Sequence, residues 1–288
     1  MTTPGSGSAT SIPSYDKTDL ALAVGVITQE LEEPATLIVS LSDEELLAIE
    51  GIQHRQLVPL PWAEKNLRTD EERAIATATA TRSLIARGLV TMDSVKDPRR
   101  ADEPGPGDKI APALRGTVVA RRTSDWVVIA ERTTSQGRAS GMFYIFDIEG
   151  NRRVLFEVFD EQGMHLFYLL DFKDFAEQFW LWIDPAREIG AEDGEPEEFP
   201  AAAFATSERS EALKQSRAAT AVVVRGREEP GPVQFSLFAR PGAVELLEAD
   251  GDGENAVQRI APLSRESLDA LVLSLVEPES DATADAGQ

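Results

Sequence analysis

Two distant segments of the chain carry the same helical pattern, and this internal similarity limits the folds that the sequence can adopt. Residues 169–183 (LLDFKDFAEQFWLWI) and 262–276 (PLSRESLDALVLSLV) align without a gap. The N-cap candidates Asp171 and Ser264 coincide in this alignment. Apolar residues also coincide at helical spacing: Leu170/Leu263, Phe175/Leu268, Phe179/Val272, Trp182/Leu275 and Ile183/Val276. The pattern therefore predicts equivalent helices at the ends of two repeated blocks.

Short strand-like runs precede each of these helices. In the first block they are residues 126–131, 142–147, 153–159 and 164–169. In the second block they are residues 219–225, 233–240, 243–249 and 256–260. Turn-forming residues separate the later runs, and a helix is expected before each set, at 111–121 and 207–217. Both blocks thus have the order helix, four antiparallel strands, helix.

The predicted fold class is α+β, with two quasi-repeated antiparallel meanders, each flanked by helices and associated side by side. A strand and helical region comes before the first meander. Residues 35–41 (ATLIVSL) predict a strand, and Ser42 with Glu45 predicts a capping box at the start of a helix. A second helix is expected after Asp70, ending at Gly88.

Composition along the chain predicts five segments. The Ser/Thr/Gly/Pro-rich residues 1–18 are expected to be disordered, and 19–184 to hold the N-terminal region with the first block. Residues 185–200 form an acidic linker in this prediction, 201–276 the second block, and 277–288 a disordered acidic tail. Neither a secretory signal nor an apolar run of spanning length is present, so a cytoplasmic protein is expected.

The inventory of charged and reactive residues excludes several classes of function. There are 28 Lys+Arg against 50 Asp+Glu, and a net charge of −22 disfavours binding to nucleic acid and to anionic membranes. Without cysteine there can be no disulfide, thiolate metal site or cysteine nucleophile. The two histidines, His54 and His165, lack metal-ligand spacing, and His165 is expected to face solvent or a polar edge. We expect a protein that is not an enzyme and that has no cofactor and no metal.

Two features instead indicate a protein partner. The stretch 132–141 (RTTSQGRASG) is predicted to be a long, flexible loop that is basic within an acidic chain. Trp180 falls outside the apolar stripe of its helix, so it belongs either to a hydrophobic patch for a partner or to a helix buried between the two blocks. The candidate partner-binding residues are Arg132, Arg138, Met142 and Trp180.

These features together resemble a known family. Two quasi-equivalent halves, an acidic chain of this length and the segments ALKQSRAATAVVVRG and APLSRESLDALVLSLV are similar to the EspG family. Its members are cytosolic chaperones of actinobacterial type VII (ESX) secretion, and the likeness extends over residues 35–276. The resemblance implies binding of a helical secreted protein or a secretion component, with a hydrophobic tip of the secreted protein masked until delivery. The oligomeric state is left open.

Two other functions stay open at this point. Residues 71–92 resemble the last helix and wing of a winged-helix transcriptional regulator, with Arg82 and Arg87 as DNA-contacting candidates. An enzyme with a carboxylate pair is the third interpretation, and Glu157 and Asp160 at the end of a predicted strand are possible members of such a pair.

Overall fold

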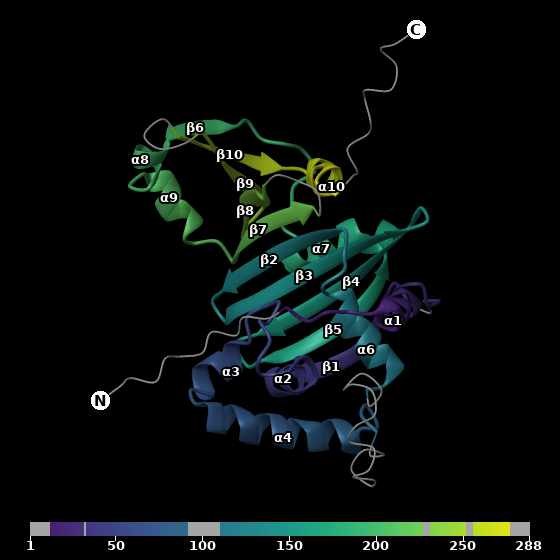
Figure 1. The fold of residues 1–288 in the computed structure, drawn as a ribbon. Coiled ribbons are helices and arrows are strands. Elements are labelled where there is room, and N and C mark those ends of the chain that lie inside the picture. The colour runs from purple at the N-terminus through teal and green to yellow at the C-terminus, as the bar shows by residue number, and fades with distance from the viewer. Residues whose placement is uncertain (1–11, 32, 92–109, 227–230, 252–255, 277–288) are drawn as a thin grey trace, which may run out of the picture. The chain divides into compact units, whose positions relative to one another are not determined.

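A computed structural model describes residues 12–31, 33–91, 110–226, 231–251 and 256–276, and the chain divides into two compact units (Figure 1). Unit 1 contains the described residues up to Asp125 together with Arg138–Phe172, and unit 2 contains Trp126–Gly137 and the described residues from Lys173 onwards. The first strand and the last helix of the predicted first block therefore fall in unit 2, which differs from the predicted segment 19–184.

Unit 1 is built on antiparallel strands in the order β1-β5-β4-β3. They are β1 (Ala35–Ser42), β5 (Met164–Asp171), β4 (Asn151–Asp160) and β3 (Gly137–Ile148). Its helices are α1 (Lys17–Ile27), α2 (Asp43–Glu50), α3 (Pro61–Asn66), α4 (Asp70–Ala86) and α6 (Pro112–Ala120). Capping boxes begin three of these helices, and one of them is the predicted box of Ser42 and Glu45. Gly88, in a left-handed conformation, follows the end of α4 as predicted.

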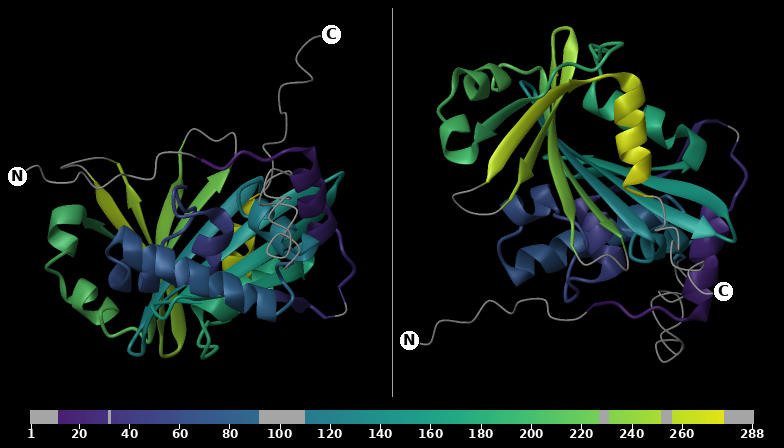
Figure 2. Two further views of the ribbon diagram at one scale, coloured as in Figure 1. Left: turned by 60° about the horizontal axis from the view of Figure 1, so that its bottom comes forward. Right: turned by 90° about the horizontal axis from the view of Figure 1, so that it is seen from above.

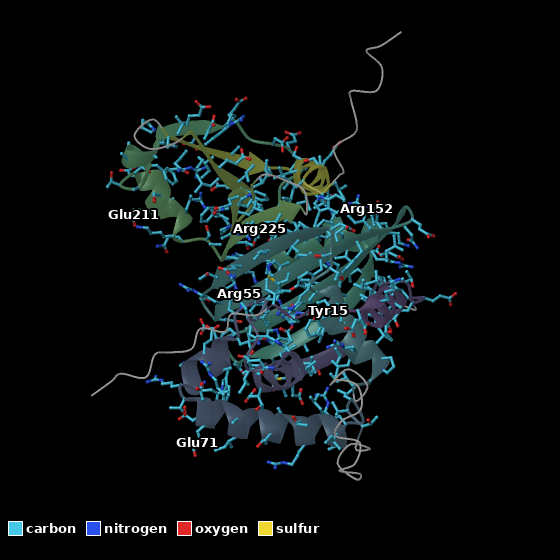
Figure 3. All side chains as sticks on the ribbon, in the orientation of Figure 1. Tyr15, Arg55, Glu71, Arg152, Glu211 and Arg225 are labelled. Carbon is cyan, nitrogen blue, oxygen red and sulfur yellow. The ribbon has the colours of Figure 1, made fainter. Side chains whose placement is uncertain are left out.

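Helices α1 and α6 pack closely because a glycine lies where they cross. A Cβ atom on Gly116 of α6 would lie 2.4 Å from the backbone oxygen of Leu22 in α1. Beside β1, α2 packs against α4. Ser83 of α4 and Arg87, the residue after its end, both donate hydrogen bonds to Glu45 of α2. Figure 3 shows Glu71 projecting from the side of α4 that lies away from α2.

Unit 2 has antiparallel strands in the order β2-β7-β8-β9-β10-β6. They are β2 (Trp126–Thr134), β7 (Ala218–Gly226), β8 (Val233–Arg240), β9 (Ala243–Asp250), β10 (Val257–Leu263) and β6 (Glu197–Pro200). Its helices are α7 (Phe175–Ile183), α8 (Ala201–Phe204), α9 (Glu208–Leu213) and α10 (Arg265–Ser274). Figure 2 shows α7 and α10 side by side, and the two helices are in contact.

The helices of unit 2 cover both faces of its sheet. Arg132 of β2 lies opposite Thr220 of β7 and contacts α7, whereas Phe238 lies opposite Ala219 and packs against Phe204 and Leu213 of α8 and α9. Because consecutive residues of a strand point to opposite faces, α7 and α8–α9 lie on opposite sides of this sheet. Both faces therefore contribute to the hydrophobic core of the unit.

The predicted α+β class is confirmed, and the order helix, four strands, helix occurs twice, as α6-β2-β3-β4-β5-α7 and α9-β7-β8-β9-β10-α10. Ser264 caps α10 as predicted. The equivalent prediction for Asp171 is wrong, because β5 continues through this residue and a 3₁₀ turn at Phe172–Asp174 precedes α7. The Asp171 side chain instead pairs with Arg153.

The predicted flexible loop at 132–141 is also wrong. β2 continues to Thr134 and β3 begins at Gly137, so most of this stretch belongs to two strands joined by a two-residue turn at Ser135 and Gln136. Gly137 has a φ of +133°, which a residue with a side chain rarely adopts. The polar composition of the stretch concealed the strands, because it lacks the alternation of apolar and polar residues that predicts them.

The segments predicted as a disordered N-terminus and an acidic linker each contain some regular structure among their described residues. α1 begins at Lys17 with Asp16 as its N-cap, inside the segment 1–18. Within 185–200, Asp193 accepts hydrogen bonds from Ser264 and Ser267 at the start of α10, and β6 pairs with β10. The predicted tail 277–288 lies outside the described residues. None of the described helices combines the length and the apolar character needed to cross a bilayer.

Candidate partner-binding surface

Arg132 faces the interior of unit 2 and contacts α7. Its Nη1 donates a 2.8 Å hydrogen bond to the backbone oxygen of Trp182, and its guanidinium carbon lies 4.2 Å from the centre of the Trp182 ring. Partial burial lowers the pKa of Arg132. Because this arginine is half-buried and occupied by a contact inside its own unit, its main role is to hold β2 to α7.

The other three candidates differ sharply in exposure. Trp180 is only 5% exposed, with the guanidinium carbons of Arg265 and Arg187 at 4.3 Å and 5.5 Å from its ring centre. Met142 is 7% exposed on β3. Arg138 is exposed and is the second residue of β3. Trp180 therefore belongs to the buried part of unit 2 and not to a surface patch. Among the four candidates, Arg138 is the one whose side chain is exposed to a partner.

Unit 2 contains an apolar groove that sequence reasoning missed. We name it the α9 groove, and its volume is about 600 Å³. Its floor is apolar and comes from α8, α9, β7, β8 and β9: Phe204, Leu213, Ala219, Phe238 and Leu247. Its rim carries hydroxyl, amide and amino groups: Thr133, Thr134, Ser135, Ser210, Gln215 and Lys214. Residues from so many elements share no sequence motif, so only the fold brings them together.

Local interactions hold both walls of the groove in place. In the turn after β2, the backbone nitrogen of Gln136 donates to Thr134 Oγ1 at 3.1 Å. Ser207 caps α9 by accepting a 3.1 Å hydrogen bond from the backbone nitrogen of Ser210. Arg209 then ties α9 to the sheet through a 3.0 Å ion pair with Glu245. The groove is thus formed before any partner binds.

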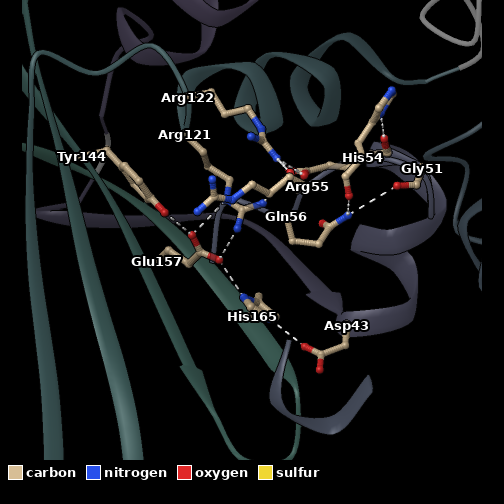
Figure 4. Close-up of polar contacts among 11 residues, drawn as sticks. Asp43, Gly51, His54, Arg55, Gln56, Arg121, Arg122, Tyr144, Glu157 and His165 are labelled. Atoms are coloured by element: carbon tan, nitrogen blue, oxygen red, sulfur yellow. Dashed lines mark hydrogen bonds and ion pairs between the residues drawn. The ribbon is translucent and has the colours of Figure 1, made fainter. Parts of the chain in front are cut away.

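Unit 1 contains a cluster of buried charges, which we call the interior network (Figure 4). Arg121, next to the end of α6, makes two 3.0 Å contacts with Glu157 of β4 and a 2.9 Å contact with Glu50 of α2. Tyr144 donates a 2.7 Å hydrogen bond to Glu157, and Arg122 pairs with Glu50 at 2.5 Å. The network joins α2, α6 and the sheet of unit 1.

His165 extends the interior network to a second carboxylate. Its Nδ1 lies 2.7 Å from Glu157 Oε1 and its Nε2 lies 2.8 Å from Asp43 Oδ1, and the ring is fully buried. The prediction that His165 faces solvent or a polar edge is therefore wrong. A doubly protonated ring donates to both carboxylates, so this geometry favours the imidazolium form.

The pKa values of the network agree with fixed, paired charges. Burial opposes the charge on His165, but the hydrogen bonds to Asp43 and Glu157 outweigh it and raise the pKa of the ring above its ordinary value. Burial would likewise raise the pKa of Glu157, but Arg121, with His165 and Tyr144, lowers it to about 2. Glu157 is thus an ionised acceptor with its donors in place and is unsuited to act as a general acid.

The residues proposed for other chemistry are also accounted for by the fold. Nδ1 of His54 lies 2.5 Å from the backbone oxygen of Glu50. Arg87 pairs with Glu45 at 2.8 Å and also donates to the backbone oxygen of Ser40, so it serves unit 1 and is not free to contact DNA. Arg82 donates to Thr79 on its own helix. Across the described parts of the chain, no group of three or more His, Asp or Glu side chains is arranged to hold a metal ion.

Comparison with known proteins gives a match at the level of structure. Neither a family model nor a curated protein sequence matches the chain. The fold is similar to the structure of the Mycobacterium tuberculosis type VII secretion system chaperone EspG5, solved in complex with a PE25–PPE41 dimer. The TM-score is 0.51 at 10% sequence identity, and the match covers 84% of this chain and 98% of the chaperone chain. The chain has an EspG-like fold.

The similarity in fold agrees with the resemblance to the EspG family inferred from the sequence. The likeness was expected over residues 35–276, and the structural match extends over most of the chain. At 10% identity it concerns the arrangement of helices and strands and not the residues of a binding site.

Proposed function

We propose that this protein is a non-enzymatic chaperone or adaptor that binds a helical protein of a type VII secretion pathway in the cytoplasm. The observation that carries the proposal is the fold similarity to a type VII secretion chaperone, which covers 84% of this chain and 98% of the other. The interior network supports a non-enzymatic role, because its charged groups are buried and paired with one another.

The α9 groove is the surface of unit 2 that we assign to this partner. Apolar side chains on one face of a partner helix would lie on the floor formed by Phe204, Phe238 and Leu247. Removing apolar surface from water contributes roughly 25 cal/mol for each Å² buried. The polar rim, with Lys214 and the nearby turn, offers hydrogen bonds that fix orientation and allow release. Of the four residues named from the sequence, Arg138 is the exposed one, and we keep it as a separate candidate for a polar contact on unit 1.

The proposal is tested by identifying what the chain binds in its own cytosol. The full chain is tagged, crosslinked in cells of the native organism and purified, and the bound proteins are identified by mass spectrometry. We expect a small helical protein that is also present in the culture medium, and no cofactor or nucleic acid. Recovery of DNA in place of such a protein, or of no secreted protein, contradicts the proposal.

A further inference from the structure

Unit 1 contains a second cleft, formed by α2, the loop 51–60 and α3. We name it the α2–α3 cleft, and its volume is about 380 Å³. Seven of its twelve lining residues are apolar: Leu47, Ile52, Leu57, Val58, Pro59, Leu60 and Ala63. Clefts of this size with an apolar lining and a few polar groups at the edge are typical binding sites.

Apolar side chains continue from the floor of the cleft to its rim. Val58 and Leu60 are 3% and 2% exposed, whereas Ile52 and Leu57 are 39% and 38% exposed. Isolated exposed apolar residues are common on protein surfaces, but here two of them adjoin an apolar cavity. The combination indicates a surface that gains free energy when another apolar group covers it.

Arg55 places at the rim of the cleft a positive charge that is unpaired within the described part of the chain. Arg55 lines the cleft and is exposed, and its side chain makes no hydrogen bond or ion pair with any residue that the structure describes. Arg73 also lines the cleft and donates from Nε to the backbone oxygen of Leu67. Glu64, an acid on the same rim, accepts a 3.3 Å hydrogen bond from the backbone nitrogen of Leu60. The rim thus carries two arginines against one glutamate, so its local charge favours an anionic group.

The loop that forms the cleft is held in shape from inside the unit. Gln56 donates to the backbone oxygens of His54 and Gly51 at 3.2 Å and 3.4 Å (Figure 4). Asp43 accepts hydrogen bonds from the backbone nitrogens of Trp62 and Ala63 at 2.8 Å and 2.9 Å, which fixes the start of α3. A cleft preformed in this way binds without a further cost of ordering its walls.

We propose that the α2–α3 cleft binds a short segment of a partner protein that carries an apolar side chain next to a carboxylate. The apolar side chain lies on the floor beside Val58 and Leu60, and the carboxylate pairs with Arg55. A second copy of the chain is disfavoured as the occupant, because each copy carries a charge of −22. This proposal concerns unit 1 alone and does not depend on the function assigned to the α9 groove.

The probe for this site is a phage-displayed library of random dodecapeptides, selected on the full chain. Enriched peptides are synthesised and titrated against protein labelled at one position. Because the chain has no cysteine, Gln53→Cys gives a unique attachment point for an environment-sensitive dye beside the cleft. We expect enriched peptides that share an apolar residue adjacent to Asp or Glu and that change the dye emission.

Matched variants then test the assigned contact. Arg55→Glu is expected to weaken peptide binding by about tenfold or more, while Arg82→Glu, an equal charge change on α4 outside the cleft, leaves it unchanged. A peptide with Lys in place of its acid is expected to bind Arg55→Glu better than it binds the wild type. Both variants should keep the wild-type urea midpoint.

Three results would overturn the proposal. They are a selection that enriches no peptide, peptides that bind the two variants equally, and a concentration-dependent dimer abolished by Arg55→Glu. The last result would assign the cleft to a second copy of the chain.

Discussion

The two units differ in the side chains that they bury between their helices and their sheet. In unit 1 the space between α2, α6 and the sheet holds Arg121, Glu157 and His165, all of which are buried and joined by hydrogen bonds. In unit 2 the buried face of α7 presents aromatic and aliphatic side chains, and Glu245 pairs with Arg209 and Arg240, which stay 18% and 30% exposed. The comparison teaches that an antiparallel sheet covered by helices can hold its helices with interior charges or with apolar contacts.

The difference predicts opposite sensitivities. A buried ion pair contributes little net stability compared with an apolar replacement, but the loss of one partner leaves an uncompensated charge in the interior. An apolar core loses only transfer and cavity terms when it is truncated. The interior of unit 1 should therefore respond strongly to single charge deletions and to pH, whereas the apolar core of unit 2 beneath α7 should respond mainly to changes in side-chain volume.

The largest effect is expected for Arg121→Met. Removing this guanidinium leaves Glu157 without its bidentate partner and Glu50 with Arg122 alone. We expect a loss of about 3–5 kcal/mol in the free energy of unfolding of unit 1. Hydrogen exchange followed by mass spectrometry measures the two units separately. Unchanged protection of β4 would show that the network does not hold the unit together.

A smaller loss is expected for Leu237→Ala in unit 2. Leu237 on β8 is fully buried, and its truncation should cost about 3 kcal/mol through lost transfer energy and a residual cavity. The loss should be the same at pH 5.5 and pH 8.5, because no titratable group changes its environment. Hydrogen exchange of β7 and β8 at the two pH values gives the measurement, and a cost that depends on pH would remove the contrast between the units.

The smallest of these effects is expected for His165→Gln, together with its pH dependence. The pKa of His165 is raised in the folded protein, so its contribution is complete below the unfolded pKa of about 6.5. It is then lost as the pH rises through the folded pKa. We expect His165→Gln to cost about 1–3 kcal/mol at pH 6, and less at alkaline pH.

The control for this prediction is the acid side of the profile. The pKa of Glu157 is lowered to about 2, so its contribution is present above the unfolded value of about 4.3 and is lost as the pH falls towards 2. His165→Gln should therefore abolish the loss of unit 1 stability above pH 6.5 but leave an acid-induced loss in place. An alkaline profile identical to that of the wild type would mean that His165 does not titrate in this range.

Local features of the fold could be predicted from the sequence. The apolar stripe that includes Phe175 and Phe179 predicted α7, and Ser264 predicted the start of α10. Strand 233–240 was predicted at the bounds that β8 occupies, because its turns and apolar content are encoded in neighbouring residues. Such signals depend on residues within a few positions of one another, so a single sequence reveals them.

The sites depend on contacts that no local pattern reveals. Asp43 and His165 are 122 positions apart in the sequence, and only the pairing of β1 with β5 and the start of α2 bring them together. Trp180 was compatible with either a surface patch or a core, and the two arginines over its ring show how the core accommodates it. The α9 groove combines residues from separate elements, so its apolar floor has no counterpart in the sequence.

The claim that the α9 groove binds the helical partner is tested most directly with two variants of β7. Ala219 lines the groove, and Ala221 lies on the same face of the strand, exposed and outside the groove. The dissociation constant for the partner captured from cytosol is measured by calorimetry with purified Ala219→Glu and Ala221→Glu proteins. We predict that Ala219→Glu weakens binding by about tenfold or more and that Ala221→Glu binds as the wild type does. Equal affinity for the two variants would contradict the assignment.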